Sequence, residues 1–297
     1  DVSVDAGALN TLDSKTTVSV SATGVNTITG TAADVNTAYA LNTAGTIHGL
    51  GNEAVTITDT SINASALINL DAHTTGVVTA AAVTTITGTF AEINALYALG
   101  ANGTITGLGN EAITISGILT VAQANTLAAQ TTGVVTATIS EGDMATLDGL
   151  TETGHAYTVT VTDTTVAAAN LITLDGKTTV NVDVTAATTL TGTLANLTTV
   201  YGAATLTGLG AEAVTISDGT ITVAQANTFA ALTTGVVTAT IATGTVAALN
   251  VLTETANAYA VTVNNASLDA GDLAILNAKT TGVVTVQATT LTGGISD

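Results

Sequence analysis

The chain has 297 residues, of which 46% are hydrophobic but only 2% aromatic, and three lysines against 22 acidic residues give a formal net charge of −19. Such an acidic chain has no basic patch that could displace counterions from phosphates, so we expect no binding to nucleic acid or to anionic membranes. Cysteine is absent, which excludes disulfides and thiolate metal sites. No apolar run reaches the ~18 residues of a membrane span, so we expect no membrane insertion.

The sequence repeats itself with a long period. The segment from Val121 to Thr126 returns from Val223 to Thr228, a shift of 102 residues (223 minus 121). Within this superrepeat lies a shorter period of about 21 to 31 residues, which is the length of one coil in a stacked solenoid. Because a repeat array grows linearly, we expect residues 1–297 to form a single solenoid array instead of two globular domains.

Four kinds of coil follow one another along the chain. Well-formed examples are coil A from Ile86 to Gly109, coil B from Ile113 to Gln130, coil C from Val134 to Thr153 and coil D from Tyr157 to Thr179. In these terms the chain is D-A-D-A-B-C-D-A-B-C-D-A, about eleven coils with the first and the last truncated. Because both ends fall in the middle of a coil, we expect a fragment of a longer chain.

Each coil has two halves with different periods. In the first half of coil D, Tyr157, Val159 and Val161 point to one side and the threonines between them to the other, as in a half-buried strand. The second half changes to helical spacing, as between Ala168 and Leu174 or between Ala248 and Leu252. Each coil is therefore expected to contain a strand followed by a helix.

Signals for helix ends support this division. Thr120 and Thr222 stand where an N-cap residue is expected. The strand resumes after Thr-Thr-Gly, whose glycine we expect to stop the helix in the left-handed conformation; these glycines are Gly76, Gly133, Gly235 and Gly282. Strands joined by helical crossovers are parallel, with right-handed connections. The predicted fold is a right-handed parallel β-solenoid with a short helix in most coils, an α/β-solenoid; a pure β-solenoid is the alternative.

The three lysines occupy one position of coil D. Lys15, Lys177 and Lys279 all precede Thr-Thr, His73 fills the same position in the remaining copy, and an aspartate usually lies two residues earlier. A Lys–Asp pair also occurs in catalytic sites, but an enzyme needs only one such site. We therefore expect each lysine to lie in the last helical turn, near the negative end of the helix dipole, worth about 0.3–1 kcal/mol.

Three glutamates recur beside glycine turns. Glu53, Glu111 and Glu212 each lie in Gly-Leu-Gly-x-Glu-Ala, which makes them weak calcium candidates. The nonapeptide of calcium-loaded β-rolls is absent, and we favour solvated acids at the sheet edge. No other cofactor is expected. The three histidines do not recur together and arginine is absent, so we expect no metal triad, no Ser-His-Asp relay and no enzymatic activity.

Threonine rows offer a further hypothesis. Strands with Thr-x-Thr, as at Thr136 and Thr138 or at Thr158 and Thr160, place hydroxyls on one face, and some solenoid proteins bind ice with such a face. Coils that vary from about 21 to 31 residues are expected to break this lattice. Exposed β-branched residues on a strand are the simpler interpretation.

The composition and repeat form resemble a known family. The Thr/Ala/Gly/Val-rich repeat resembles the tandem arrays of giant bacterial cell-surface proteins, in particular those associated with swimming motility in marine cyanobacteria. The likeness covers the whole chain through Thr-Thr-Gly-Val-Val-Thr-Ala, Gly-Leu-Gly-Asn-Glu-Ala and Leu-Asp-x-Lys-Thr-Thr. That family offers no catalytic pattern, so no functional residue carries over. The resemblance implies an extended element that is extracellular or at the cell surface.

These features predict a structural repeat segment, a spacer or stalk, of a large extracellular or cell-surface protein involved in adhesion or motility. The alternative is a solenoid that binds calcium, ice or a glycan through its threonine or acidic rows. The expected partners are the neighbouring repeats of the same chain. An array without caps exposes a strand edge and core at each end, so we also expect end-to-end self-association.

Overall fold

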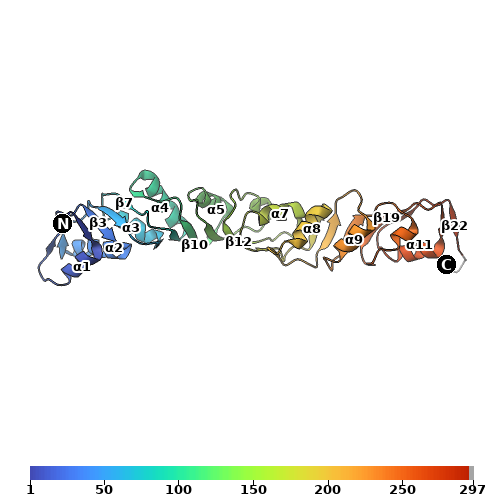
Figure 1. Cartoon of the computed structure of the whole chain (residues 1–297), viewed down its shortest axis with the longest axis horizontal. Coiled ribbons are helices and arrows are strands. Elements are labelled where there is room, and N and C mark those ends of the chain that lie inside the picture. Colours follow the sequence, from blue (N-terminus) through green and yellow to red (C-terminus); the bar gives the residue numbers. More distant parts are fainter. Residues whose placement is uncertain (294–297) are drawn as a thin grey trace. The chain divides into compact units, whose positions relative to one another are not determined.

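The computed structural model describes residues 1–293 and shows a parallel α/β solenoid. Helices and strands alternate along the chain (Figure 1), and all strand pairs recorded in this range are parallel. The predicted α/β-solenoid is confirmed over the pure β-solenoid, and the handedness of the coils stays a prediction. No helix within residues 1–293 has the length and apolar character needed to cross a bilayer.

The chain divides into two compact units. The first consists of Asp1–Ser140 with Leu150–Thr158, and the second of Glu141–Gly149 with Val159–Asp297. The helices of the first unit are α1 (Ala6–Asp13), α2 (Ala32–Ala44), α3 (Ala64–Asp71), α4 (Phe90–Asn102) and α5 (Val121–Ala128). Those of the second are α6 (Met144–Leu147), α7 (Ala168–Asp175), α8 (Leu194–Gly202), α9 (Val223–Ala230), α10 (Val246–Leu249) and α11 (Ala270–Asn277).

In the first unit the strands form three ladders, in the orders β1-β3-β5-β7-β9, β6-β8-β10-β11-β12 and β2-β4. Their bounds are β1 (Ser3–Asp5), β2 (Val20–Ser21), β3 (Thr27–Gly30), β4 (Ile47–His48), β5 (Ala54–Ile57), β6 (Ser61–Asn63), β7 (Val78–Thr79), β8 (Thr85–Gly88), β9 (Ile105–Thr106), β10 (Ala112–Leu119), β11 (Val135–Ile139) and β12 (Ala156–Thr160). The first three residues of β12 belong to this unit.

In the second unit the end of β12 begins the order β12-β14-β16, beside the ladders β13-β15-β17-β18-β19-β21 and β20-β22. The bounds are β13 (Thr165–Ala167), β14 (Val182–Asp183), β15 (Thr189–Gly192), β16 (Leu206–Thr207), β17 (Ala213–Ile216), β18 (Val237–Thr240), β19 (Ala258–Val263), β20 (Ser267–Asp269), β21 (Val284–Val286) and β22 (Thr290–Thr292). Each unit therefore repeats the same strand–helix layout.

Alternation along the strands and helical spacing place the core as predicted. Tyr157, Val159 and Val161 are buried while the threonines between them are exposed. In α7 the residues Ala168, Leu171 and Leu174 are buried, which leaves the polar side of the helix in solvent. The prediction is wrong near α10, because this short helix ends at Leu249; Leu252 is buried beyond it and Ala248 is exposed.

The helix starts combine a local cap with one from the next coil. Thr120 and Thr222 are N-caps of α5 and α9, and in both a glutamine at the third helical position completes a capping box, which confirms the prediction. In addition, a side chain of the following coil accepts the first helical N–H of α2, α6, α8 and α10. These acceptors are Asp59, Asp163, Asp218 and Asn265, at 2.6 to 2.7 Å.

The predicted role of the Thr-Thr-Gly glycines is wrong. Helices α3, α5, α9 and α11 end well before these glycines, and within residues 1–293 the glycines with positive φ lie elsewhere. A Cβ on Gly76, Gly133 or Gly235 would instead lie 2.1 to 2.2 Å from a carbonyl oxygen of the preceding coil. Glycine is required there because two backbones approach closely. The left-handed helix ends are at Gly45 and Gly103, with φ of 84° and 83°.

The lysines also lie outside the helices. Helices α1, α7 and α11 end two residues before Lys15, Lys177 and Lys279, and the lysine backbone N–H donates to a leucine carbonyl at 2.9 to 3.0 Å to close the following turn. The placement of lysine in the last helical turn is therefore wrong.

Candidate functional site

The three recurring glutamates lie immediately before β5, β10 and β17, and they are buried. Glu53 and Glu111 have no exposed surface and Glu212 is 3% exposed. The prediction of solvated acids at the sheet edge is therefore wrong. Burial of such polar groups is costly unless hydrogen bonds replace those to water, so the partners of each carboxyl group decide its role.

Each carboxyl group is bound by two donors from its own coil. The glycine N–H two residues earlier lies within 3.1 Å of both carboxyl oxygens. A tyrosine hydroxyl donates to one of those oxygens at 2.9 to 3.1 Å, from a buried residue at Tyr39 and Tyr97 and from a half-buried one at Tyr201. We call these groups the Tyr–Glu clusters; they consist of Tyr39, Gly51, Glu53 and Thr74; Tyr97, Gly109, Glu111 and Thr131; and Tyr201, Gly210, Glu212 and Thr233.

The threonine of each cluster joins two successive coils. The hydroxyl of Thr74 donates to the backbone carbonyl of Glu53 at 2.7 Å, and the N–H of Gly76 donates back to that hydroxyl at 3.0 Å. The same two bonds recur at Thr131 and Thr233. In these three places the threonine of a Thr-Thr-Gly element hydrogen-bonds to the backbone of the glutamate in the preceding coil. The glycine of the element permits the close approach of the two backbones.

The tyrosines remain protonated at neutral pH. Burial raises the pKa of Tyr39, Tyr97 and Tyr201 above the usual range of a phenol, and the charge of the neighbouring glutamate raises each pKa further. Burial also raises the pKa of Tyr157 and Tyr259 to about 12. Each hydroxyl of a Tyr–Glu cluster therefore serves as a fixed hydrogen-bond donor.

The geometry of these clusters suits a structural role better than calcium binding. Each cluster offers a single carboxyl group that already accepts N–H and O–H bonds, whereas calcium takes six to eight oxygen ligands. Among residues 1–293 no three His, Cys, Asp or Glu side chains are grouped so that they could hold a metal ion. Glu53, Glu111 and Glu212 are fixed by hydrogen bonds within the solenoid.

The three histidines have three different environments. The ring of His73 stacks on Tyr39 with centroids 5.6 Å apart, and Nδ1 of His48 lies 2.9 Å from the hydroxyl of Ser19. His155 is buried, and its Nδ1 accepts the N–H of Val135 at 3.1 Å. Burial lowers the pKa of His155, against the opposing charge of Glu152.

The second superrepeat repeats the His155 contact with an amide. Asn257, 102 residues later (257 minus 155), accepts the N–H of Val237 through Oδ1 at 2.7 Å. At both positions a neutral side chain accepts a backbone N–H at the start of a strand. This makes His155 a structural acceptor at the start of β11, a role that the sequence pattern did not indicate.

The threonine rows are in register. In the first unit Thr29, Thr56, Thr79 and Thr106 face one another in sequence across β3, β5, β7 and β9. Equivalent rows join Thr87, Thr114 and Thr136 in the first unit and Thr191, Thr215 and Thr238 in the second. The expectation that varying coil length breaks the rows is wrong, because length differences such as 13 residues in α2 against 8 in α3 lie outside the strands.

The rows are narrower than the Thr-x-Thr pattern suggests. Thr138 faces Thr158, but Thr136 faces Ala156. The position two residues before the threonine row is alanine in β5 (Ala54) and valine just before β7 (Val77). A row one threonine wide, flanked by alanine and valine, is thus the continuous feature of the sheet.

Comparisons with protein-family models, with curated proteins and with solved structures find no match to this chain.

Proposed function

We propose that this chain is a structural spacer or stalk segment of a large cell-surface protein. The observation that supports this most directly is that its recurring polar side chains form hydrogen bonds within and between coils. The Tyr–Glu clusters, the Thr-Thr-Gly elements and the aspartates at the helix starts recur at equivalent positions, and most of them bind a neighbouring coil. A chain in which recurring threonine and aspartate side chains bind a neighbouring coil is suited to bearing load along the array.

Cooperation between neighbours supplies the mechanism. In a solenoid each coil contacts the coils before and after it, so stability is roughly a sum of coil and interface contributions. Parallel backbone ladders and inter-coil hydrogen bonds strengthen those interfaces. The extracellular or surface location, and a part in adhesion or motility, rest on the resemblance to the tandem arrays of bacterial surface proteins.

Force spectroscopy tests the mechanical role. The 297-residue chain, held between two marker domains of known unfolding force, should resist extension and then unfold in discrete steps. The Glu111→Ala variant should lower the force of a step in the first unit. Smooth extension at low force, without steps, would contradict the proposal. Surface location is tested by antibody labelling of intact cells of the producing organism, and labelling only after permeabilisation would exclude it.

Ice binding is the second candidate, and the in-register threonine rows favour it. Rows in register give hydroxyls and methyl groups at the strand spacing of about 4.8 Å, as a lattice-matching surface requires. Partitioning into a growing ice front tests this function, with Thr56→Lys and Thr79→Lys as variants that interrupt the row. A protein left wholly in the liquid would end the ice hypothesis. An unchanged melting temperature in the presence of a chelator would end the calcium hypothesis.

A further inference from the structure

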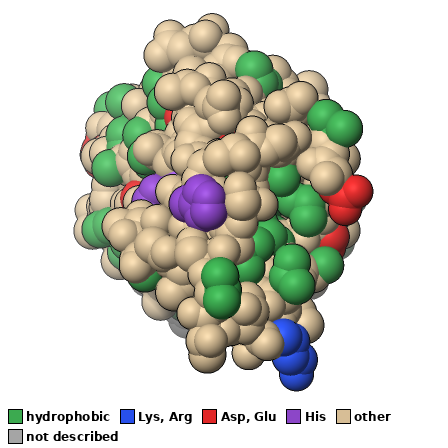
Figure 2. Space-filling view, turned by 90° about the vertical axis from the view of Figure 1, so that its left-hand side faces the viewer, with side chains coloured by type: hydrophobic (Ala, Val, Ile, Leu, Met, Phe, Trp, Pro, Cys, Tyr) green, Lys and Arg blue, Asp and Glu red, His purple; other side chains and the backbone are tan. Residues whose placement is uncertain are grey.

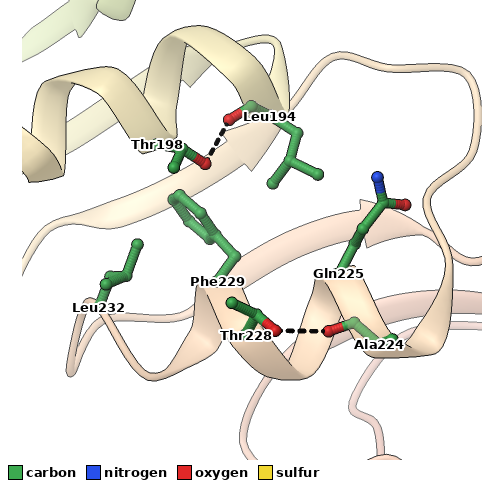
Figure 3. A pocket seen from close by; sticks show the side chains of 7 residues that line it. All are labelled: Leu194, Thr198, Ala224, Gln225, Thr228, Phe229 and Leu232. Atoms are coloured by element: carbon green, nitrogen blue, oxygen red, sulfur yellow. Dashed lines mark hydrogen bonds between the residues drawn. The ribbon is translucent and has the colours of Figure 1, made fainter.

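A cleft lies between α8 and α9 in the second unit, with a cavity volume of about 280 Å³ (Figure 3). Leu194 and Thr198 of α8 form one wall and Thr228 of α9 lies opposite. Phe229 is fully buried and forms the floor, whereas Leu232 is 40% exposed at the rim. The cleft is therefore closed by an aromatic ring on its inner side and open to solvent on its outer side.

The hydroxyls of the two cleft threonines are engaged within the helices that carry them. The hydroxyl of Thr198 donates to the carbonyl of Leu194 at 2.7 Å, and that of Thr228 donates to the carbonyl of Ala224 at 2.9 Å (Figure 3). Both hydroxyls are therefore satisfied within their own helices. None of the residues that line the cleft is charged, so its interior is apolar.

One polar group lies at the edge of the cleft. The side-chain oxygen of Gln225 accepts the N–H and the hydroxyl of Thr222 at 2.8 and 3.0 Å, which completes the capping box of α9. The capping box uses only the oxygen, so the amide NH₂ of Gln225 can donate to a molecule in the cleft. This group would recognise an acceptor oxygen.

In the first unit, a hydrogen bond between two polar side chains spans the equivalent position, between α4 and the residues that follow α5. Asn94 is the fifth residue of α4, as Thr198 is of α8, and Gln130 stands 102 residues before Leu232 (232 minus 130). In the first unit the Nε2 of Gln130 donates to the Oδ1 of Asn94 at 3.0 Å. In the second unit both partners are replaced, so the bridge is lost and an apolar cleft stands in its place.

We propose that the cleft between α8 and α9 binds a compact, uncharged molecule that has an apolar body and one acceptor oxygen, such as a small ketone, alcohol or ester. The volume limits the ligand to one ring or a short chain, and the apolar walls favour its burial. Without a lining cation, and within a chain of net charge −19, an anionic ligand is disfavoured. The donor of Gln225 selects an oxygen-bearing molecule over a pure hydrocarbon.

The test uses acetophenone as the probe, followed by ligand-observed saturation-transfer NMR with the whole chain. We expect saturable binding of acetophenone and no binding of benzoate, which has nearly the same size but carries a negative charge. The double variant Thr198→Asn with Leu232→Gln rebuilds the bridge of the first unit and should weaken binding about tenfold or more. No saturable binding to the original chain, or equal binding to the double variant, would overturn the proposal.

Two further variants keep the test independent of folding. Gln225→Glu preserves the acceptor of the capping box but removes the donor, so binding of acetophenone should weaken while binding of toluene is unchanged. Equal loss for both probes would refute the role of the donor. Conversely, Asn94→Thr with Gln130→Leu should open a second site in the first unit and double the stoichiometry; unchanged stoichiometry would contradict the assignment. Melting curves confirm that each variant folds.

Discussion

At the scale of single residues, acidic side chains in repeated segments differ widely in burial. Glu111 is fully buried and bound by Gly109 and Tyr97, whereas Glu254 is exposed. Both belong to repeated segments, Glu111 to Gly-Leu-Gly-x-Glu-Ala and Glu254 to Thr-Glu-Thr. The Gly-Leu-Gly loop brings the N–H of Gly109 to the carboxyl group of Glu111.

Glu111→Ala should therefore be strongly destabilising. It leaves the partly buried N–H of Gly109 and the buried hydroxyl of Tyr97 without an acceptor, and each buried group of this kind costs about 1–3 kcal/mol. We expect the free energy of unfolding in urea to fall by about 2–4 kcal/mol, and by about 1 kcal/mol for Tyr97→Phe, which removes one bond and leaves the carboxyl group in place. Glu254→Ala is the matched control, and an equal loss in that variant would refute the structural role of the cluster.

His155 gives a prediction with a defined direction in pH. Because burial lowers its folded-state pKa below the ordinary value of 6.5, the neutral ring contributes stability that is present above pH 6.5 and is lost as the pH falls through the folded-state pKa. Protonation of Nδ1 would remove the acceptor for the N–H of Val135. His155→Asn copies the residue at Asn257 and cannot be protonated.

We expect His155→Asn to match the original chain at pH 7 and to exceed its melting temperature at pH 5. The reverse change, Asn257→His, should add a loss of stability at pH 5. Because both variants share all carboxylates with the original chain, their differences isolate the imidazole. Identical pH profiles for the three proteins would show that His155 is not protonated on unfolding.

At the scale of elements, glycine has two distinct uses in the first unit. Gly103 ends α4 with a positive φ, whereas Gly133 has ordinary dihedrals and lies against the backbone of Glu111. The sequence shows both as recurring glycines that follow helical segments. A recurring glycine alone does not reveal whether a turn or a close approach requires it.

Gly133→Ala should be among the most damaging single substitutions. Its Cβ would lie 2.2 Å from the carbonyl oxygen of Glu111, a backbone atom that cannot move without disturbing the coil before it. We expect a loss of at least about 3 kcal/mol in the free energy of unfolding, in the range of severe overpacking. Gly202→Ala is the control, because nothing lies within 4 Å of its added Cβ. Equal stability of the two variants in urea melts would contradict this account.

The same contrast explains which parts of the fold the sequence predicts. Alternation at Tyr157, Val159 and Val161 and the caps at Thr120 and Thr222 are local signals, and the structure confirms them. The interactions that the sequence missed are between coils: the cap from Asp163 to α6, the close approach at Gly133 and the acceptor at His155. A single strand–helix pattern carries no information about which atoms of the next coil lie opposite.

At the scale of the whole molecule, the terminal coils lack a cover that inner coils have. The valine after Thr-Thr-Gly, or in the matching place of the first coil, recurs along the chain. Val77, Val134 and Val236 are 43 to 44% exposed, whereas Val18 and Val283 in the terminal D coils are 73% and 70% exposed. At the end of the first unit that carries the N-terminus, hydrophobic side chains reach the surface in several patches and charged ones are few (Figure 2).

A polypeptide of these 297 residues should therefore associate end to end, since a second copy can cover both the apolar surface and the free strand edge. Leu291 in β22, in the last coil of the second unit, is 62% exposed, and Leu291→Asp should weaken association by placing a charge in that contact. Because the net charge of −19 opposes association, higher salt should strengthen it. Sedimentation velocity over a range of concentrations measures the effect. A monomer at all concentrations and salt conditions would contradict the prediction, and equal association of Leu291→Asp would place the contact elsewhere on the surface.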